Sequence, residues 1–347
     1  MAIPRLEFAA ATGPQPPRKD HFLMNRSSRF GLSTALAVVL AFQPTVRASE
    51  PEKLLPADSE FVLSLNMKQV VESDIIKKFA LEQLKQALQG ADAKKFLTEL
   101  GLDPLKDVDR VVVGGSGKDQ SDTKGLAIIH GKFDPEKLFK AAEAQTKKDP
   151  DHFTMVKDGK DVMFKYQPDN GNPVYGTVVD ESTVIASNDK KSITTALAVS
   201  GKPTLSKDLS ALISKQDDKA SLWVVGVLKD KLNNLKLPKG GGAPANIQGQ
   251  IEKVETMAIV VRIGTDISLD VTLGMKDGDS AEELGKTIED GLQQIKGAVP
   301  FLAAMNQQLK PLVDVVKTLK STVKDRTVNI TGKMAGSAIG ELLKMGD

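Results

Sequence analysis

The sequence predicts an α+β protein made of two related units, each an antiparallel sheet with helices on one face (a two-layer sandwich), preceded by a cleaved signal peptide. Three observations lead to this prediction. An apolar run near the N-terminus ends in small residues, the strand-like segments alternate apolar and polar positions, and a hairpin-plus-helix order occurs twice along the chain.

The N-terminal segment has the parts of a secretory signal. Residues 24–48 carry Arg26 and Arg29 near their start, continue through the uncharged run Phe30–Phe42 and end in small residues. We therefore expect cleavage between Ala48 and Ser49. Residues 1–23 are rich in Pro, Ala and charge and show no helical or strand period. We interpret them as a leader that is either untranslated or unstructured.

A membrane anchor is the alternative interpretation of the apolar run. Crossing a bilayer takes about 20 apolar residues, and this run is shorter and ends at Gln43-Pro44. We therefore expect export to the periplasm, the cell envelope or the extracellular space, with no stable membrane span after signal cleavage.

Composition limits the partners. The chain has 47 basic and 45 acidic residues, but residues 1–48 carry six of the basic and two of the acidic ones. The remaining chain, with 41 against 43, lacks the basic excess that binding to nucleic acid requires. It has no cysteine and hence no disulfide, which for an exported protein of this size favours a bacterial source.

The first unit is placed at residues 56–202. Periodicity, N-capping Asp-Pro pairs and turn dipeptides define its elements. In order, we expect a strand at 59–67, helices at 68–88 and 93–100, two strands around a polar turn at 116–124, a helix from Asp134-Pro135 to about Thr146, hairpins turning at Asp158-Gly159 and Asp180-Glu181, and a helix at 190–199.

The second unit is placed at residues 206–345 and repeats this order. It begins with a strand at 220–227, a helix at 229–235 and a Gly-rich linker at 238–246. Strands at 254–263 and 266–275 then turn at Gly264-Thr265 and lead into a helix at 280–295, as the corresponding hairpin of the first unit leads into its helix. The correspondence is one of pattern, because few residues are identical.

The strand faces predict how each unit is built. In the segment DISLDVTLGM the apolar residues Ile267, Leu269, Val271 and Leu273 point one way, and Ser268, Asp270 and Thr272 point the other. RTVNITGKM, residues 326–334, alternates in the same way. Strands with one apolar and one polar face need helices on only one side of the sheet.

No catalytic, cofactor or metal site is recognisable. LGKT at 284–287 resembles a phosphate-binding loop, but Ser280 stands where that loop needs glycine. His130 and His152 are interpreted as structural or surface residues, since no cysteine or close histidine pair accompanies them. The acidic segment 276–283 is interpreted as a loop and helix N-terminus rather than a calcium site.

The segment Gly297–Val323 is unusually apolar and is interrupted by Pro311, which should kink or split the helix. One interpretation is a helix pair packed on the sheet. The other is a flap for an apolar ligand or a partner protein, formed by Phe301, Leu302, Met305, Leu309, Leu312 and Val316.

Three phrases carry a resemblance to a known group of proteins. LLPADSEFVLSLNMKQVVES, LGLDPLKDVDRVVVGG and HGKFDPEKL resemble exported bacterial proteins of unknown function that are common in planctomycete-like genomes. The resemblance covers most of the chain after the signal peptide. It implies an envelope protein and assigns no catalytic residue.

These observations leave three hypotheses of function. The first is a non-enzymatic secreted or periplasmic binding or interaction module whose ligand is unknown, with a protein or an apolar small molecule as partner. The second is a carrier of an apolar ligand, such as a lipid, in the bacterial envelope. The third is a carboxylate-based hydrolase using His130, Asp134 or Asp277, and it is supported only by the abundance of Asp and Glu.

Overall fold

The structure is a computed structural model that describes residues 52–88, 102–117, 122–159, 161–169, 171–198, 201, 204–234 and 246–343. All of them belong to one compact unit within residues 46–347. The leader at 1–23, the signal peptide at 24–48, the Ala48-Ser49 cleavage site and the helix expected at 93–100 lie outside the described residues.

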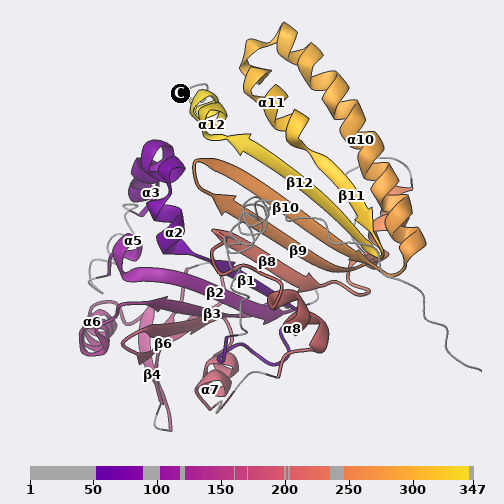
Figure 1. Ribbon diagram of the computed structural model, residues 1–347. Coiled ribbons are helices and arrows are strands. Elements are labelled where there is room, and N and C mark those ends of the chain that lie inside the picture. The colour runs from indigo at the N-terminus through magenta and orange to yellow at the C-terminus, as the bar shows by residue number, and fades with distance from the viewer. Residues whose placement is uncertain are drawn as a thin grey trace, which may run out of the picture. The chain divides into compact units, whose positions relative to one another are not determined.

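The strands form one twelve-stranded antiparallel sheet in the order β11-β12-β10-β9-β8-β1-β2-β3-β7-β6-β5-β4 (Figure 1). Their bounds are β1 Phe61–Leu65, β2 Val108–Ser116, β3 Lys124–Gly131, β4 Phe153–Asp158, β5 Asp161–Tyr166, β6 Val174–Asp180, β7 Thr183–Ser187, β8 Leu222–Val227, β9 Val254–Ile263, β10 Asp266–Met275, β11 Lys320–Lys324 and β12 Thr327–Ala335.

The α-helices are α2 Met67–Glu72, α3 Leu81–Leu88, α5 Pro104–Asp107, α6 Pro135–Lys148, α7 Lys190–Ala198, α8 Lys207–Ile213, α9 Ile247–Ile251, α10 Gly278–Met305, α11 Lys310–Thr318 and α12 Gly336–Leu343. A π-helical stretch, η2 Ile76–Ala80, separates α2 from α3. Two 3-10 turns, η3 Leu232–Asn234 and η4 Gln307–Leu309, complete the described elements.

The sheet is continuous across the two predicted units. Strand β1 pairs with β2 on one side and with β8 on the other, so Val62 lies opposite both Gly114 and Val225. Outward from this centre the order is β1-β2-β3-β7-β6 in one direction and β8-β9-β10-β12-β11 in the other.

The prediction that helices cover only one face is wrong for the sheet as a whole. Helices α7 and α8 pack on the face of Val62 and Val225, whereas α10 packs on the opposite face, against Leu273 and Val328. The reason lies in the central strands, which are nearly continuous apolar runs and need cover on both sides. The alternating strands β10 and β12, from which one face was inferred, lie away from this centre.

Several local predictions are confirmed. Asp134 and Asp277 cap α6 and α10, where each side chain accepts a hydrogen bond from the backbone N–H three residues on. The hairpin turn at Asp158-Gly159 is present, with Gly159 in the left-handed region at φ 59°. Pro311 lies in the first turn of α11, so the apolar segment is split into two helices.

Other local predictions are wrong. The continuous helix expected at 68–88 is interrupted at Ser73, whose hydroxyl donates a hydrogen bond to the Val70 carbonyl at 2.7 Å. In the segment expected to be a helix at 229–235, the described residues form only the short turn η3.

Candidate functional site

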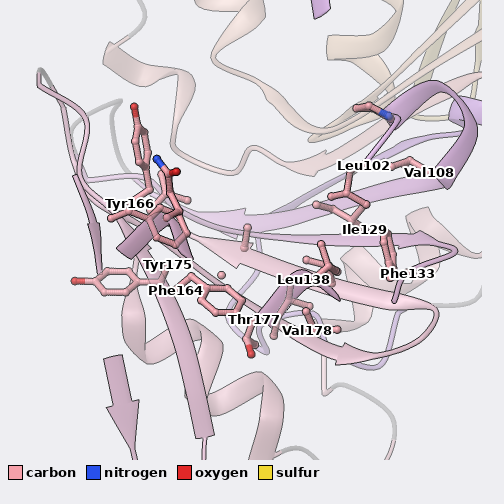
Figure 2. Close-up of a pocket in the computed structure, with 18 of the residues that line it drawn as sticks. Leu102, Val108, Ile129, Phe133, Leu138, Phe164, Tyr166, Tyr175, Thr177 and Val178 are labelled. Carbon is pink, nitrogen blue, oxygen red and sulfur yellow. The ribbon is translucent and has the colours of Figure 1, made fainter. Parts of the chain in front are cut away.

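A cavity of about 800 Å³ lies between helix α6 and one face of the sheet (Figure 2). Strands β2, β3, β5, β6 and β7 supply one wall, and α6 supplies the other. Most lining side chains are aliphatic or aromatic. They include Val111, Ile129, Leu138, Phe164, Val178 and Val184.

The strand register explains the apolar wall. Val111 lies opposite Ile129, Ile129 opposite Val184, and Val184 opposite Val178, so four side chains from four strands share one face. All four are β-branched and therefore suit a strand, but these short side chains do not fill the space between the sheet and the helix above it. They keep accessible surface, whereas Ile128 and Ile185 on the opposite face are fully buried.

Helix α6 is held over this wall by its own apolar stripe. Leu138 and Ala142, four residues apart on one side of the helix, are buried. The Phe139 ring contacts the Phe164 ring with 5.2 Å between centroids, and Phe164 also stacks on Phe153 at 6.2 Å. These aromatic contacts hold α6 above β4 and β5 and leave the space beneath the rest of the helix open.

The cavity changes character along its length. Leu102, Val108, Ile129 and Phe133 lie toward one end, near the start of α6, while Tyr166 lies toward the other (Figure 2). Apart from Thr177, the polar lining side chains gather at the Tyr166 end, in and beyond the last turn of α6. They are Gln145, Asp149, His152 and Asp169.

His152 is held between two carboxylates at the polar end. Its Nδ1 lies 2.9 Å from Asp149 Oδ1, and its Nε2 lies 2.8 Å from Asp169 Oδ1. The hydrogen bonds with Asp169 and Asp149 and the charge of Asp149 raise the pKa of His152 to about 9. The ring is therefore an imidazolium at neutral pH and donates an N–H to each carboxylate.

The other candidate histidine belongs to a separate cluster. His130 Nε2 lies 3.3 Å from Glu52 Oε2, and Glu52 also pairs with Arg110. Burial of Glu52 acts to raise its pKa, but the hydrogen bond with His130 and the charge of Arg110 prevail, so its pKa is lowered. The cluster fastens the entry segment at Glu52 to strands β2 and β3, which is a structural role.

The predicted flap residues lie elsewhere. Phe301, Leu302 and Met305 are on α10, Leu309 is on η4, and Leu312 and Val316 are on α11. None of them lines the cavity under α6. Val316 is buried, whereas Phe301, Leu302 and Met305 are exposed, so the flap stays a prediction.

Sequence reasoning missed the cavity. Its lining comes from segments between Met67 and Ala186 that meet only because β3 pairs with β7 and β7 with β6. The one available signal was His152, with Asp149 three residues before it. Asp169 reaches the same ring from beyond strand β5 and could not be assigned to it from spacing alone.

Two features are absent from the described residues. Within those ranges, no three His, Asp or Glu side chains are placed to hold a metal ion. No described helix is long and apolar enough to cross a membrane.

Comparison with known protein families, with curated proteins and with solved structures found no match. The resemblance to exported planctomycete-like proteins therefore stays a prediction.

Proposed function

We propose that this protein binds an amphiphile, with its apolar part in the cavity beneath α6 and its polar group at the His152 end. The observation that carries the proposal is a cavity of about 800 Å³ with a mainly apolar lining. Ligand pockets typically measure about 300–1,000 Å³ and are apolar with a few polar groups that orient the ligand.

The arrangement of polar groups favours an amphiphile over a purely apolar ligand. An apolar ligand would need no carboxylates or imidazolium at the wall, and such groups lose hydration when an apolar molecule covers them. At the Tyr166 end, the Gln145 amide offers donors and an acceptor to a polar group, and Asp149 and Asp169, which His152 orients through both of its ring N–H groups, offer acceptors.

The proposal develops the carrier hypothesis and keeps the non-enzymatic role. A reproducible turnover by the purified protein, abolished by substitution of a cavity residue, would contradict that role. The apolar segment 297–323, first considered as the flap of such a carrier, has no part in this site.

The test uses two neighbouring valines on β6. Val178 lines the cavity, whereas Val179, at an irregularity in the β6–β7 pairing, does not line it and is 36% exposed. Delipidated protein is titrated with a fluorescent fatty acid and a fluorescent lysophosphatidylcholine. Val178→Trp should fill part of the cavity and weaken binding at least tenfold, while Val179→Trp should bind as the wild type does.

Two outcomes would contradict the proposal. One is that the wild-type protein binds neither probe. The other is that Val178→Trp and Val179→Trp bind a probe equally well, which would place the probe outside the cavity. Circular dichroism and thermal unfolding confirm that both variants are folded before their affinities are compared.

We also propose that the two halves of the sheet are the two predicted related units. The strand order on either side of the β1–β8 pair supports this, as does the helix that follows the third strand of each half, α6 after β3 and α10 after β10. A crystal structure in which β1-β2-β3-β7-β6 does not superpose on β8-β9-β10-β12-β11 would contradict it.

We further propose export to the periplasm or cell envelope. The arginines, apolar run and small residues of segment 24–48 support it. N-terminal sequencing of the protein from its host's envelope fraction should begin at Ser49. A chain that retains Met24 or Met1 would contradict cleavage.

A further inference from the structure

The charged groups of the α6 cavity gather at its Tyr166 end, and the two signs are not balanced. Among the described residues that line the cavity, Asp149 and Asp169 are negatively charged, and His152 between them is positively charged at neutral pH. No lysine or arginine lines the cavity in the part of the chain that the structure describes. The lining therefore carries one negative charge in excess.

The charged donors at this end are already engaged. His152 Nδ1 lies 2.9 Å from Asp149 Oδ1 and Nε2 lies 2.8 Å from Asp169 Oδ1, so both ring N–H groups are used within the cluster. An anionic ligand group would meet only the neutral donors of Gln145 and Tyr166. The Asp169 side chain, by contrast, is 85% exposed, and a carboxylate can accept about four hydrogen bonds. This end of the cavity suits a donor better than an acceptor.

Helix α6 adds negative charge at the same end. Its last turn reaches the Tyr166 end, where Gln145 lines the cavity. The C-terminal carbonyls of a helix together act as about half a negative charge, which favours a cation nearby. Lys147 and Lys148, also in the last turn, are exposed and do not line the cavity.

The rest of the cavity has no unpaired polar side chain among the described residues. Thr177, the polar lining residue away from the Tyr166 end, donates its hydroxyl to the Val162 carbonyl at 2.8 Å. The buried side-chain atoms without a partner belong to residues outside the lining, namely Ser59, Gln69, His130, Gln250 and Ser321. A polar ligand group placed beneath α6 would lose hydration without gaining a hydrogen bond, so the polar groups of the ligand are confined to the Tyr166 end.

We propose that the ligand is an amphiphile with a cationic, hydrogen-bond-donating head, such as a long-chain primary amine. Its hydrocarbon chain lies beneath α6, and its ammonium group donates to Asp169 and faces the C-terminal end of α6. This inference rests on the proposed function, because it names the chemical class of the amphiphile. A fatty acid of the same chain length binds through its hydrocarbon, but more weakly, since its carboxylate meets charges of its own sign.

Three ligands with the same dodecyl chain separate the effect of the head from that of the chain. Dodecylamine, 1-dodecanol and dodecanoic acid each compete with the fluorescent lysophosphatidylcholine for delipidated protein at neutral pH. The wild type should bind the amine most tightly and the acid least, with about a fivefold difference between them, because one exposed charge pair changes an affinity by about 1.4- to fivefold and the two heads have opposite signs. Added salt should reduce this difference.

Substitution of Asp169 tests the assigned group. Asp169→Asn keeps the size of this exposed side chain and removes its charge, so it should reduce the preference for the amine over the acid to about twofold or less. Asp290→Asn removes the same charge at an exposed position of α10 outside the cavity and should leave the preference unchanged. Circular dichroism confirms that both variants are folded.

Two results would overturn this inference and leave the proposed function standing. One is that the wild type binds dodecanoic acid as tightly as dodecylamine. The other is that Asp169→Asn keeps the preference of the wild type. A wild type that binds none of the three dodecyl ligands and neither fluorescent probe would instead contradict the proposed function itself.

Discussion

Two neighbouring valines on β2 lie in different environments, one at a cavity and one in a filled core. The same substitution should therefore change the stability of the fold in opposite directions at the two positions. Val111 lines the α6 cavity and keeps accessible surface, while Val112 is 2% exposed in the core packed by α7 and α8. Replacing either by Phe keeps a residue that is favourable in strands and adds an apolar ring. We expect Val111→Phe to stabilise the fold and Val112→Phe to destabilise it.

The magnitudes follow from the space available. If about two of the carbons that Val111→Phe adds become buried in the cavity, the gain at about 0.8 kcal/mol each is about 1–2 kcal/mol. At position 112 no such space exists, and overpacking a filled core costs about 1–3 kcal/mol. The free energies of unfolding of the two variants should therefore differ by about 2–5 kcal/mol.

Urea unfolding followed by circular dichroism measures the difference, and probe titration measures the effect on binding. Val111→Phe should also bind the fluorescent fatty acid more weakly than the wild type, because its ring occupies the ligand's space. If Val111→Phe destabilises the protein as much as Val112→Phe does, the cavity is already filled in solution, and the reasoning is refuted.

Three further predictions concern single groups. The pKa of His152 is raised to about 9 from an ordinary 6.5, so the stabilising contribution of its ion pairs is complete below pH 6.5 and is lost as the pH rises through 9. The free energies of unfolding of the wild type and of His152→Gln, measured with urea, should therefore converge over that range. A difference between them that does not depend on pH would contradict this. Gly131→Ala should destabilise the fold by about 2 kcal/mol or more, because the added Cβ would overlap the Asp107 carbonyl oxygen. Gly249→Ala should be neutral or stabilising, because its Cβ would meet nothing within 4 Å. Equal urea unfolding midpoints for the two variants would count against the close approach of Gly131 to Asp107. Asp277→Ala removes the acceptor for the Ser280 N–H at 2.7 Å and should cost about 1 kcal/mol in urea unfolding, and an unchanged midpoint would show that the cap contributes nothing.

Local structure was predictable wherever a few adjacent residues decide it. Asp134-Pro135 sets the start of α6, Asp158-Gly159 sets a hairpin, and the alternation in residues 266–275 predicts the strand β10.

The arrangement of layers was less predictable. The alternation of apolar and polar residues in β10 predicts helices on only one face of the sheet. The central strand Phe61–Leu65, however, has apolar side chains on both faces and belongs to a sheet covered on both sides. Its position between β2 and β8 depends on pairing with distant segments, since Val62 lies opposite Gly114, 52 residues along the chain, and Val225, 163 residues along, and periodicity does not encode such pairing.

The site was the least predictable part. A cavity is space that side chains leave unfilled, and it depends on how far α6 is held from Val111, Val178 and Val184 rather than on any one of them. The pairing of His152 with Asp169 likewise requires the β4–β5 hairpin to bring the chain back. By contrast, the apolar segment 297–323 was visible in the sequence, where it was interpreted as a helix pair packed on the sheet or as a flap for an apolar ligand or a partner protein.

The central claim, an amphiphile in the α6 cavity, is tested most directly by native mass spectrometry of the protein purified from its own host without delipidation. We predict an added mass of a few hundred daltons that is removed by organic extraction, is present in wild type and Val179→Trp, and is absent in Val178→Trp. An added mass that persists in Val178→Trp, or a bare chain that takes up neither fluorescent probe, would contradict the claim.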